Sequence, residues 1–378
     1  MAATRKTPAH PPTLAEVANH AHVSPKTVSN VVNNRPYISE ETRTKVRRAI
    51  AELGYRPSAV ARSLVTGKTN TIGIIIPDVS NPFFGQAILG CEKILNESGY
   101  DMVLGDTDEN GEKERGYLNS LTAKGADGLI IWGGQVALRE VLEITAGRIP
   151  VITVDSAIQE LEGSVTAVNV DNENGAALAV GHLVLAGRKR IGHLAGPTYR
   201  LTARKRQDGY ITALKVAGIP FDPCLVVEGA PSIRGGYRSA LRLLENQKAD
   251  ALFCYNDLMA IGAVVACNHL GISIPRDLAL VGFDDITASA LITPALTTVR
   301  VAQYELGRKA GALLLDRLEG RETEPRSVDF PVELRVRNSC GTKTLSQEEM
   351  RDILENLVSS VAVDLPEHNS GECKKEDP

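Results

Sequence analysis

Short β-rich segments alternate with helical segments along most of this chain, and this alternation is the feature that most limits the possible fold. The expected strands lie at 72–77, 101–105, 128–132, 151–154, 190–194, 251–254 and 278–282. Segments with apolar residues at helical spacing lie between them, at 83–97, 112–123, 174–185, 237–244 and 258–270. Such alternation predicts parallel sheets covered by helices on both faces. About 270 residues of this pattern are enough for two lobes.

Polar side chains follow several of the expected strands, at the edge where ligands bind in open parallel sheets. These carboxylates and amides are Asp78, Asn81, Asp106, Asp108, Asp155, Asn256, Asp257, Asp284 and Asp285. Around a cleft they could accept hydrogen bonds from several hydroxyl groups, while Phe83 or Phe84 stacks on the apolar face of a sugar ring. The pattern therefore predicts a sugar-like ligand. The alternative, in which each Asp or Asn only caps the next helix, stays open at this point.

Three helices are expected near the N-terminus, because each is preceded by a capping side chain. These caps are Thr13 before 14–21, Ser24 before 25–32 and Ser39 before 40–53. Glu16 completes a capping box with Thr13, and Pro25 occupies the first helical position, where its missing N–H is not needed. Gly54 ends the third helix.

The second of these helices would present a polar face to solvent. Apolar residues of all three helices can close one small core, namely Leu14, Val17, Ala18, Ala21, Val23, Val28, Val31, Val32, Val46, Ile50 and Leu53. The polar face comprises Lys26, Thr27, Ser29, Asn30 and Asn33. Residues 1–68 hold 11 Lys and Arg against 4 Asp and Glu, whereas the remainder holds 31 against 42. A basic three-helix unit with a tight turn favours a helix-turn-helix domain over a generic bundle.

At this point the residues resemble a known family of bacterial regulators, the lactose-repressor/galactose-repressor (LacI/GalR) family. Near the N-terminus the similar segments are 13–18 (TLAEVA), 23–33 (VSPKTVSNVVN), 38–42 (ISEET) and 53–64 (LGYRPSAVARSL). Further along they are 78–84 (DVSNPFF), 168–175 (VNVDNENG), 204–210 (RKRQDGY), 255–257 (YND), 281–285 (VGFDD), 294–300 (PALTTVR) and 304–307 (YELG). The resemblance therefore covers residues 13 to about 340.

The resemblance implies how the N-terminal domain would bind DNA. Base readout would come from Pro25, Lys26 and Asn30, and contacts to phosphates or groove walls from Thr27, Ser29, Arg35, Tyr37 and Arg62. Asn30 replaces the arginine often found at its position, and because a carboxamide pairs best with adenine, the favoured half-site should differ there. Residues from 57 to about 64 would form a hinge helix that folds on DNA, with Leu64 inserted into the minor groove.

The resemblance also implies a two-lobed core similar to periplasmic sugar-binding proteins, crossed by the chain three times near 169–172, 299–302 and 329–332. With the residues selected above, the predicted effector contacts are Phe83, Phe84, Asp106, Asp155, Arg200, Thr202, Arg206, Asn256 and Asp284. Arg206 and Asp284 are the leading candidates. Arg200 and Thr202 match positions that contact a purine in purine-binding members, but Pro231 stands where those members have an aromatic residue. We therefore expect a sugar or sugar derivative, with a purine or a protein co-regulator as the alternative effector.

The expected organisation follows from these segments. It comprises a disordered tail at 1–12, a helix-turn-helix domain at 13–56, a hinge helix and linker at 57–68 and a core at 69–341. Lobe one would take about 69–169 and 302–329, and lobe two about 172–299 and 332–341. In the extension at 342–378, Ser346 and Glu349 form a second capping box before apolar residues at heptad-like spacing, so a short helix is expected there.

The chain is thus expected to be a transcriptional regulator, acting as a repressor, that binds a palindromic operator as a homodimer. A tetramer joined through the C-terminal helix is the alternative assembly. No glycine-rich nucleotide signature or nucleophile elbow follows a strand, so no enzyme activity, catalytic residue, metal site or cofactor is predicted. The six scattered cysteines indicate small buried side chains, and no segment has the apolar length of a signal or membrane span. A cytoplasmic location is expected, which opposes the rival class of exported sugar-binding proteins.

Overall fold

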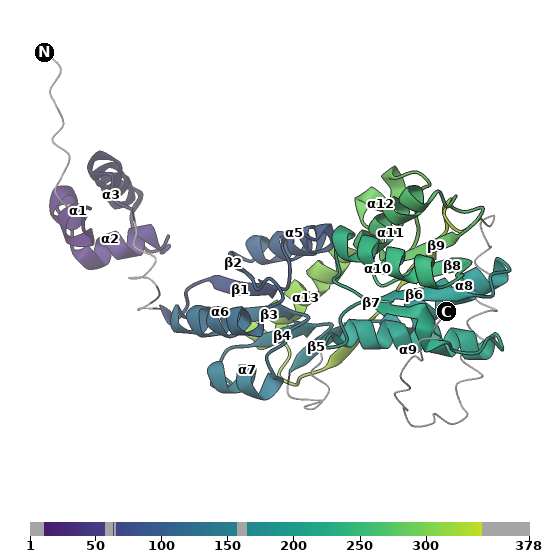
Figure 1. Cartoon of the computed structure of the whole chain (residues 1–378). Helices are drawn as coiled ribbons and strands as arrows, with labels where there is room; N and C mark the ends of the chain where they lie inside the picture. Colours follow the sequence, from purple (N-terminus) through teal and green to yellow (C-terminus); the bar gives the residue numbers. More distant parts are fainter. Residues whose placement is uncertain (1–10, 57–62, 64–65, 157–164, 342–378) are drawn as a thin grey trace, which may run out of the picture. The chain divides into compact units, whose positions relative to one another are not determined.

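The computed structural model describes residues 11–56, 63, 66–156 and 165–341, and it divides the chain into two compact units, Met1–Thr69 and Asn70–Pro378 (Figure 1). Most of the expected N-terminal tail, most of the expected hinge helix with Arg62 and Leu64, and the whole C-terminal extension lie outside the described residues. Predictions about those segments stay predictions. None of the described helices is long and apolar enough to cross a membrane.

The N-terminal unit contains the three expected helices with the expected bounds. They are α1 (Leu14–Ala21), α2 (Pro25–Val32) and α3 (Glu40–Leu53). The capping box is present, because the Thr13 amide donates to a Glu16 carboxylate oxygen at 2.6 Å and the Glu16 amide donates to the Thr13 hydroxyl at 3.3 Å. Gly54 ends α3 with a φ of +67°, in the left-handed region that glycine adopts without strain.

A small closed core holds these helices together. Val17, Val28 and Val46 are each fully buried, one from each helix. The segment between α2 and α3 is tied down by Arg43, whose guanidinium donates to the backbone carbonyl of Arg35 at 3.0 Å. The apolar residues of all three helices point into this core, and Pro25, Lys26 and Asn33 of the outward side of α2 are exposed.

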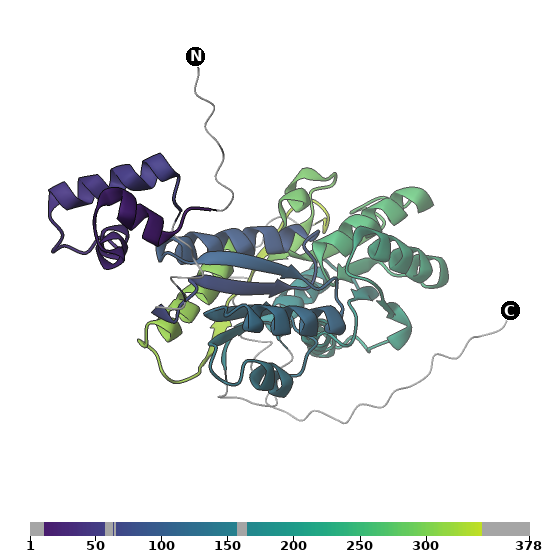
Figure 2. The same cartoon turned by 90° about the vertical axis from the view of Figure 1, so that its left-hand side faces the viewer.

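The larger unit is built on two six-stranded sheets (Figures 1 and 2). The first has the order β11-β5-β4-β3-β1-β2 and is wholly parallel. Its strands are β1 (Thr71–Ile76), β2 (Asp101–Asp106), β3 (Gly128–Trp132), β4 (Val151–Val154), β5 (Thr166–Val170) and β11 (Ser327–Phe330). The helices of this lobe are α5 (Pro82–Glu97), α6 (Gly111–Ala123), α7 (Leu138–Ile144) and α13 (Gln303–Leu318).

The second sheet has the order β12-β10-β9-β8-β6-β7. Its strands are β6 (Ile191–Ala195), β7 (Val226–Glu228), β8 (Ala251–Cys254), β9 (Ala279–Asp284), β10 (Thr297–Arg300) and β12 (Glu333–Arg335). The helices of this lobe are α8 (Asn172–Leu185), α9 (Leu201–Val216), α10 (Ile233–Asn246), α11 (Asp257–Leu270) and α12 (Thr287–Leu291), with a 3₁₀ turn at Pro223–Leu225. Only β12 runs antiparallel within this sheet as described, because the chain enters it directly from β11 without a crossover helix.

The chain passes between the two sheets three times. It leaves the first sheet after β5, returns after β10, and leaves it again between β11 and β12. These three connections join the two lobes into one unit. The carboxyl ends of the strands of both lobes face a shared cleft. The expected two-lobed α/β core with parallel sheets is therefore confirmed.

Helices α5 and α13 lie against each other in the first lobe (Figure 1). Their close approach depends on glycine, because a Cβ atom on Gly90 would overlap the carbonyl of Tyr304 and one on Gly307 would overlap the carbonyl of Ala87. The backbones of the two helices are therefore in direct contact. Helix α13 also packs against β3, β4 and β5 of the first sheet.

The cysteines fit the expectation of small buried side chains at four positions. Cys91, Cys254, Cys267 and Cys340 are buried. Cys224 departs from it, because it is only half-buried. It lies in the 3₁₀ turn rather than in an apolar core.

Candidate functional site

The cleft between the two sheets brings together eight of the nine side chains predicted to bind an effector. Its volume is about 820 Å³, including space open to solvent. The predicted residues that line it are Phe83, Phe84, Asp155, Arg200, Thr202, Arg206, Asn256 and Asp284. They come from both lobes, at the ends of strands or the starts of the helices that follow them. The strand-end pattern selected Asp155, Asn256 and Asp284, whereas Arg200, Thr202 and Arg206 were implied by the resemblance.

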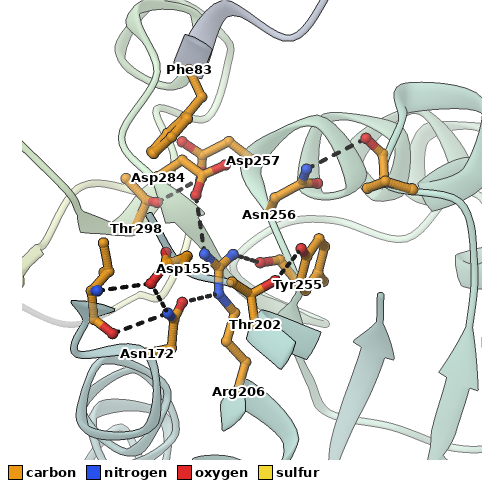
Figure 3. Close-up of polar contacts among 12 residues, drawn as sticks. Phe83, Asp155, Asn172, Thr202, Arg206, Tyr255, Asn256, Asp257, Asp284 and Thr298 are labelled. Carbon is orange, nitrogen blue, oxygen red and sulfur yellow. Dashed lines mark hydrogen bonds and ion pairs between the residues drawn. The ribbon is translucent and has the colours of Figure 1, made fainter. Parts of the chain in front are cut away.

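Arg206 stands at the centre of this cleft (Figure 3). Its side chain comes from α9 and is 5% exposed. The guanidinium donates to the Asn172 side-chain oxygen at 2.9 Å and to the backbone carbonyl of Tyr255, and it lies 3.5 Å from Asp284. Its Cζ also lies 3.6 Å from the ring centre of Phe283, a cation–π contact that holds the planar group in place. Arg206 is therefore rigidly oriented without any ligand contact.

Asp155 lies beside Arg206 at the end of β4. One carboxylate oxygen accepts from the backbone amide of Val170 at 2.8 Å and from the Asn172 side chain at 3.2 Å. Asn172 in turn accepts from Arg206, so a chain of hydrogen bonds links the first lobe to α9 of the second. Burial raises the pKa of Asp155 to about 6, although the amide of Val170 and the charge of Arg206 act in the opposite direction.

Asp284 ends β9 and faces Arg206. It is 5% exposed, and burial raises its pKa to about 7 against the lowering effect of Arg206. Its φ of +111° and the φ of +56° at Asp285 place two consecutive non-glycine residues in the left-handed half of backbone space. Arg337 holds the second of them, donating to Asp285 at 2.6 Å. Such local strain is typical of functional sites, and here it turns the Asp284 carboxylate toward the cleft.

Asp257 lies next to these residues but has a structural role. Its carboxylate is fully buried and accepts hydrogen bonds from Thr298 at 2.5 Å, from Ser289 at 2.6 Å and from the amide of Ile286 at 2.9 Å. It therefore ties the start of α11 to β10 and to the loop before α12. Burial raises its pKa to about 7. Of the two neighbouring acids, only Asp284 lines the cleft.

Asn256 caps a helix and also lines the cleft, so both interpretations of this residue stay possible. It is the N-cap of α11, accepting from the Met259 amide at 2.9 Å, and its amide nitrogen donates to the Pro231 carbonyl at 3.4 Å. The same side chain also lines the cleft. Capping and ligand contact are compatible, because the carboxamide oxygen can accept a second hydrogen bond and the amide nitrogen has a second hydrogen to donate.

Asp106 lies apart from the other predicted effector residues. Its carboxylate accepts from the amide of Val79 at 3.2 Å and from the amide of Asp108 at 3.4 Å, and it is absent from the described cleft lining. It thereby fixes the loops that follow β1 and β2. The strand-end pattern selected Asp106 because it ends β2. Its carboxylate oxygen instead accepts hydrogen bonds from two backbone amides of the neighbouring loops.

Several cleft residues were not singled out from the sequence. Trp132, the only tryptophan of the chain, lines the cleft at the end of β3 together with Glu109, Glu114, Gln135, Tyr199 and Tyr255. Glu109 accepts from the Tyr199 hydroxyl at 2.6 Å and pairs with Arg200 at 2.8 Å, so it bonds the first lobe to the second. Trp132 is the last residue of an expected strand, and the strand-end pattern considered only polar residues after a strand. Glu109 could have been selected by that pattern, because it lies next to Asp108, which was selected.

The aromatic side chains form apolar surfaces at the cleft. Phe83 and Phe84 pack edge to face with ring centres 5.2 Å apart, at the start of α5. Tyr255 lies on the opposite lobe, where its hydroxyl pairs with Thr202 at 2.8 Å and its ring centre is 4.7 Å from the Arg206 guanidinium. The cleft therefore offers aromatic surfaces together with inward-pointing acids, amides and guanidinium groups.

The described side chains predicted to contact DNA lie on α2 or just after it. Pro25, Lys26, Asn33, Arg35 and Tyr37 are exposed, and Thr27, Ser29 and Asn30 are half-buried. Tyr37 is 69% exposed, which is unusual for a large aromatic residue without a partner. The N-terminal unit therefore presents one polar and basic helix face with the core on its other side.

Comparison with known proteins assigns both units. Residues 13–58 match the model of "Bacterial regulatory proteins, lacI family", and residues 69–338 match "Periplasmic binding proteins and sugar binding domain of LacI family". The chain is 33% identical over 328 residues to the HTH-type transcriptional repressor CytR of Escherichia coli K12, covering 86% of this chain and 96% of that protein. It is 35% identical to Catabolite control protein A of Priestia megaterium, covering 86% and 98% of the two chains.

Two solved structures support the same assignment of the chain. The Lac repressor dimer bound to operator and the anti-inducer ONPF has a TM-score of 0.79 and 29% identity, covering 88% of this chain and 99% of that one. The complex of the transcriptional regulator CelR with cellobiose has a TM-score of 0.67 and 30% identity, covering 87% and 99%. With both units matched in order along the chain, this protein belongs to the lacI family of bacterial regulatory proteins.

Proposed function

We propose that this protein is a transcriptional repressor that binds a palindromic operator as a homodimer and responds to a sugar or sugar derivative bound in the cleft. The observation that carries the proposal is that one chain combines a basic helix-turn-helix unit with a cleft lined by eight predicted effector side chains. A single small reading domain makes few contacts, so two copies on a two-fold site are needed for useful affinity. The proposed function involves no covalent chemistry.

The cleft chemistry supports a sugar. The Asp155 and Asp284 carboxylates can accept from adjacent hydroxyls, and Arg206 presents its guanidinium between them. Phe83 and Phe84 can cover the apolar face of a ring. A site built from charged groups that already hold one another in place favours a ligand with many hydroxyls, since each hydroxyl can both donate and accept.

The angle between the two lobes is the feature through which the effector would change operator affinity. An effector contacting Asp155 on the first lobe and Asp284 on the second favours one angle between the lobes over others. The three crossings between the sheets are where that angle can change. Coupling free energies of about 1–3 kcal/mol are typical for such links and correspond to a roughly 5- to 150-fold change in operator affinity.

DNA binding is assigned to the outward face of α2. Lys26 and Asn30 would contact base edges, while Arg35 and Tyr37 would contact the backbone. The Asn30 carboxamide favours adenine in the half-site. Lys26 is fully available for this role, because it is exposed at the start of the helix.

The test joins operator selection to an effector screen. Purified protein selects duplexes from a random pool, and the affinity for the selected duplex is then measured at several salt concentrations. We expect a steep loss of affinity with salt and a weaker complex for Lys26→Ala. Lys45→Ala is the matched control, because Lys45 is an exposed lysine of α3 paired with Glu41.

Effectors are found by thermal shift with sugars, sugar phosphates, nucleosides and purines, and each hit is then added to the protein–operator complex. Purines are included because Arg200 and Thr202, which match purine-contacting positions, line the cleft. Pro231 argues against a purine, because it supplies no aromatic ring to stack on the base. We expect a sugar to stabilise the core and to alter operator affinity. Failure to prefer any duplex over random competitor, with or without a stabilising compound, would refute the proposed function.

A further inference from the structure

Both guanidinium groups that line the described part of the cleft are already bonded to carboxylates of the protein. Arg206 faces Asp284 within its own lobe. Arg200, at the start of α9, pairs with Glu109 of the opposite lobe at 2.8 Å. Neither cation is therefore available to a ligand without the loss of an existing charge pair.

Glu109 is held in position to make this contact. Asp108 and Glu109 have φ values of +49° and +55°, a left-handed turn that non-glycine residues rarely adopt. The Asp106 carboxylate accepts from the Asp108 amide at 3.4 Å, and Gln135 donates its side-chain amide to the Glu109 carbonyl at 2.6 Å. The turn is thus fixed from both sides, with the carboxylate directed across the cleft.

Tyr199 strengthens the same contact. Its hydroxyl donates to the second carboxylate oxygen of Glu109 at 2.6 Å. Both oxygens of Glu109 are therefore bonded to the second lobe. Burial raises the pKa of Tyr199 to about 12, and its hydrogen bond to the Glu109 carboxylate adds to this effect, so the phenol remains a donor at neutral pH.

The charges at this contact are largely removed from water. The side chains of Arg200 and Glu109 are 18% and 20% exposed. Four carboxyl groups line the cleft, those of Glu109, Glu114, Asp155 and Asp284, whereas Arg200 and Arg206 are the described cations there. An anionic ligand would have to approach these carboxyl groups without a free positive partner, and at short range in a partly desolvated site such repulsion is large.

We propose that Glu109 makes the cleft selective for uncharged effectors by occupying Arg200, so that phosphorylated or carboxylated ligands are excluded. The inference rests on the proposed function, because it concerns which ligands the effector cleft accepts. It identifies a repulsive element that works beside the attractive ones, which is how discrimination between similar ligands is often achieved. An uncharged sugar avoids the penalty, since its hydroxyls can share Glu109 and Arg200 without separating them.

The test measures anion binding directly and uses inorganic phosphate as the probe. Trp132 is the only tryptophan and lines the cleft, so its fluorescence reports binding there. The wild type, Glu109→Gln and Glu109→Ala are titrated with phosphate at constant ionic strength. Glutamine keeps the shape and can still accept from Arg200, but it leaves the guanidinium charge unneutralised. We expect both variants to bind phosphate with a Kd at least about tenfold lower than that of the wild type.

Two further variants locate the effect. Glu109→Gln combined with Arg200→Gln should lose the gain, because the freed guanidinium is gone. Glu112→Gln removes an equal charge from an exposed neighbour that pairs with Arg115, and it should behave as the wild type. Circular dichroism establishes that each variant is folded before it is titrated.

Either of two results would overturn the inference. One is that the wild type binds phosphate as tightly as the Glu109 variants do. The other is that the gain persists in the variant that also lacks Arg200. The measurement uses neither operator nor natural effector, so it can fail while operator control by a sugar stands. Conversely, loss of operator selectivity would refute the proposed function and leave the anion result intact.

Discussion

Replacing Asp257 with asparagine should make the stability of the core less sensitive to pH. The Asp257 carboxylate is fully buried and accepts three hydrogen bonds, from Thr298, Ser289 and the amide of Ile286. Asparagine preserves the shape and one acceptor oxygen but cannot ionise. The substitution therefore separates the cost of burying a charge from the loss of a hydrogen bond.

The magnitude follows from the pKa of this group. Burial is the main cause that raises the pKa of Asp257, from 3.8 to about 7, and the three hydrogen bonds offset only part of it. One pKa unit corresponds to about 1.4 kcal/mol, so ionisation above pH 7 costs the folded core up to about 4 kcal/mol relative to the unfolded chain. Because the folded pKa is the higher one, the favourable contribution is complete below about pH 4 and is lost as the pH rises through 7.

Urea unfolding followed by circular dichroism at about pH 5 and about pH 7.5 measures this effect. Between these values the wild type should lose roughly 2–3 kcal/mol of unfolding free energy relative to Asp257→Asn. Asp277→Asn is a control of opposite sign, because Asp277 is exposed and its hydrogen bond from Arg276 lowers the pKa of its carboxyl. If the wild type and Asp257→Asn differ equally at both pH values, ionisation of Asp257 does not limit stability and the reasoning is wrong.

Four further substitutions test the packing and the two sites. Val46→Ala should lower the unfolding free energy of the N-terminal unit by about 2 kcal/mol in thermal unfolding, because two methyl groups leave a closed core. Gly307→Ala should lower the Tm of the core, because its methyl group would overlap the carbonyl of Ala87. Arg206→Met should abolish the thermal shift caused by the effector, because it removes the guanidinium that holds Asn172 and Asp284 in place in the cleft. Asn30→Arg should change the preferred half-site base from adenine to guanine, worth about 1–3 kcal/mol in competition binding.

Local signals were sufficient for the N-terminal helices. Each helix begins after its capping side chain, and the observed bounds of all three agree with those expected. A cap depends on atoms within three or four residues, so the chain needs no distant partner to place it. For the same reason Gly54 was readily identified as the end of α3, where φ is +67°.

The spacing of apolar residues was less informative where an element buries polar side chains. Helix α9 was not predicted, because the charged Arg206 and the glycine Gly209 interrupt the apolar residues on the side that it buries. Strand β5 was also missed; only alternate residues of Thr166–Val170 are buried, and Asn169 interrupts the run. Both elements carry or adjoin the effector cleft, where chemistry overrides the usual distribution of polar residues.

The sequence by itself determined the fold class, the order of the two units and the strand ends that carry polar side chains, because these depend on periodicity and on caps a few residues long. Only the tertiary structure decided what each polar group does. It turned Asp257 into the core and Asp284 into the cleft, and it joined Glu109 to Tyr199, 90 residues away. Such pairings depend on how one sheet faces the other, and no local signal encodes that placement.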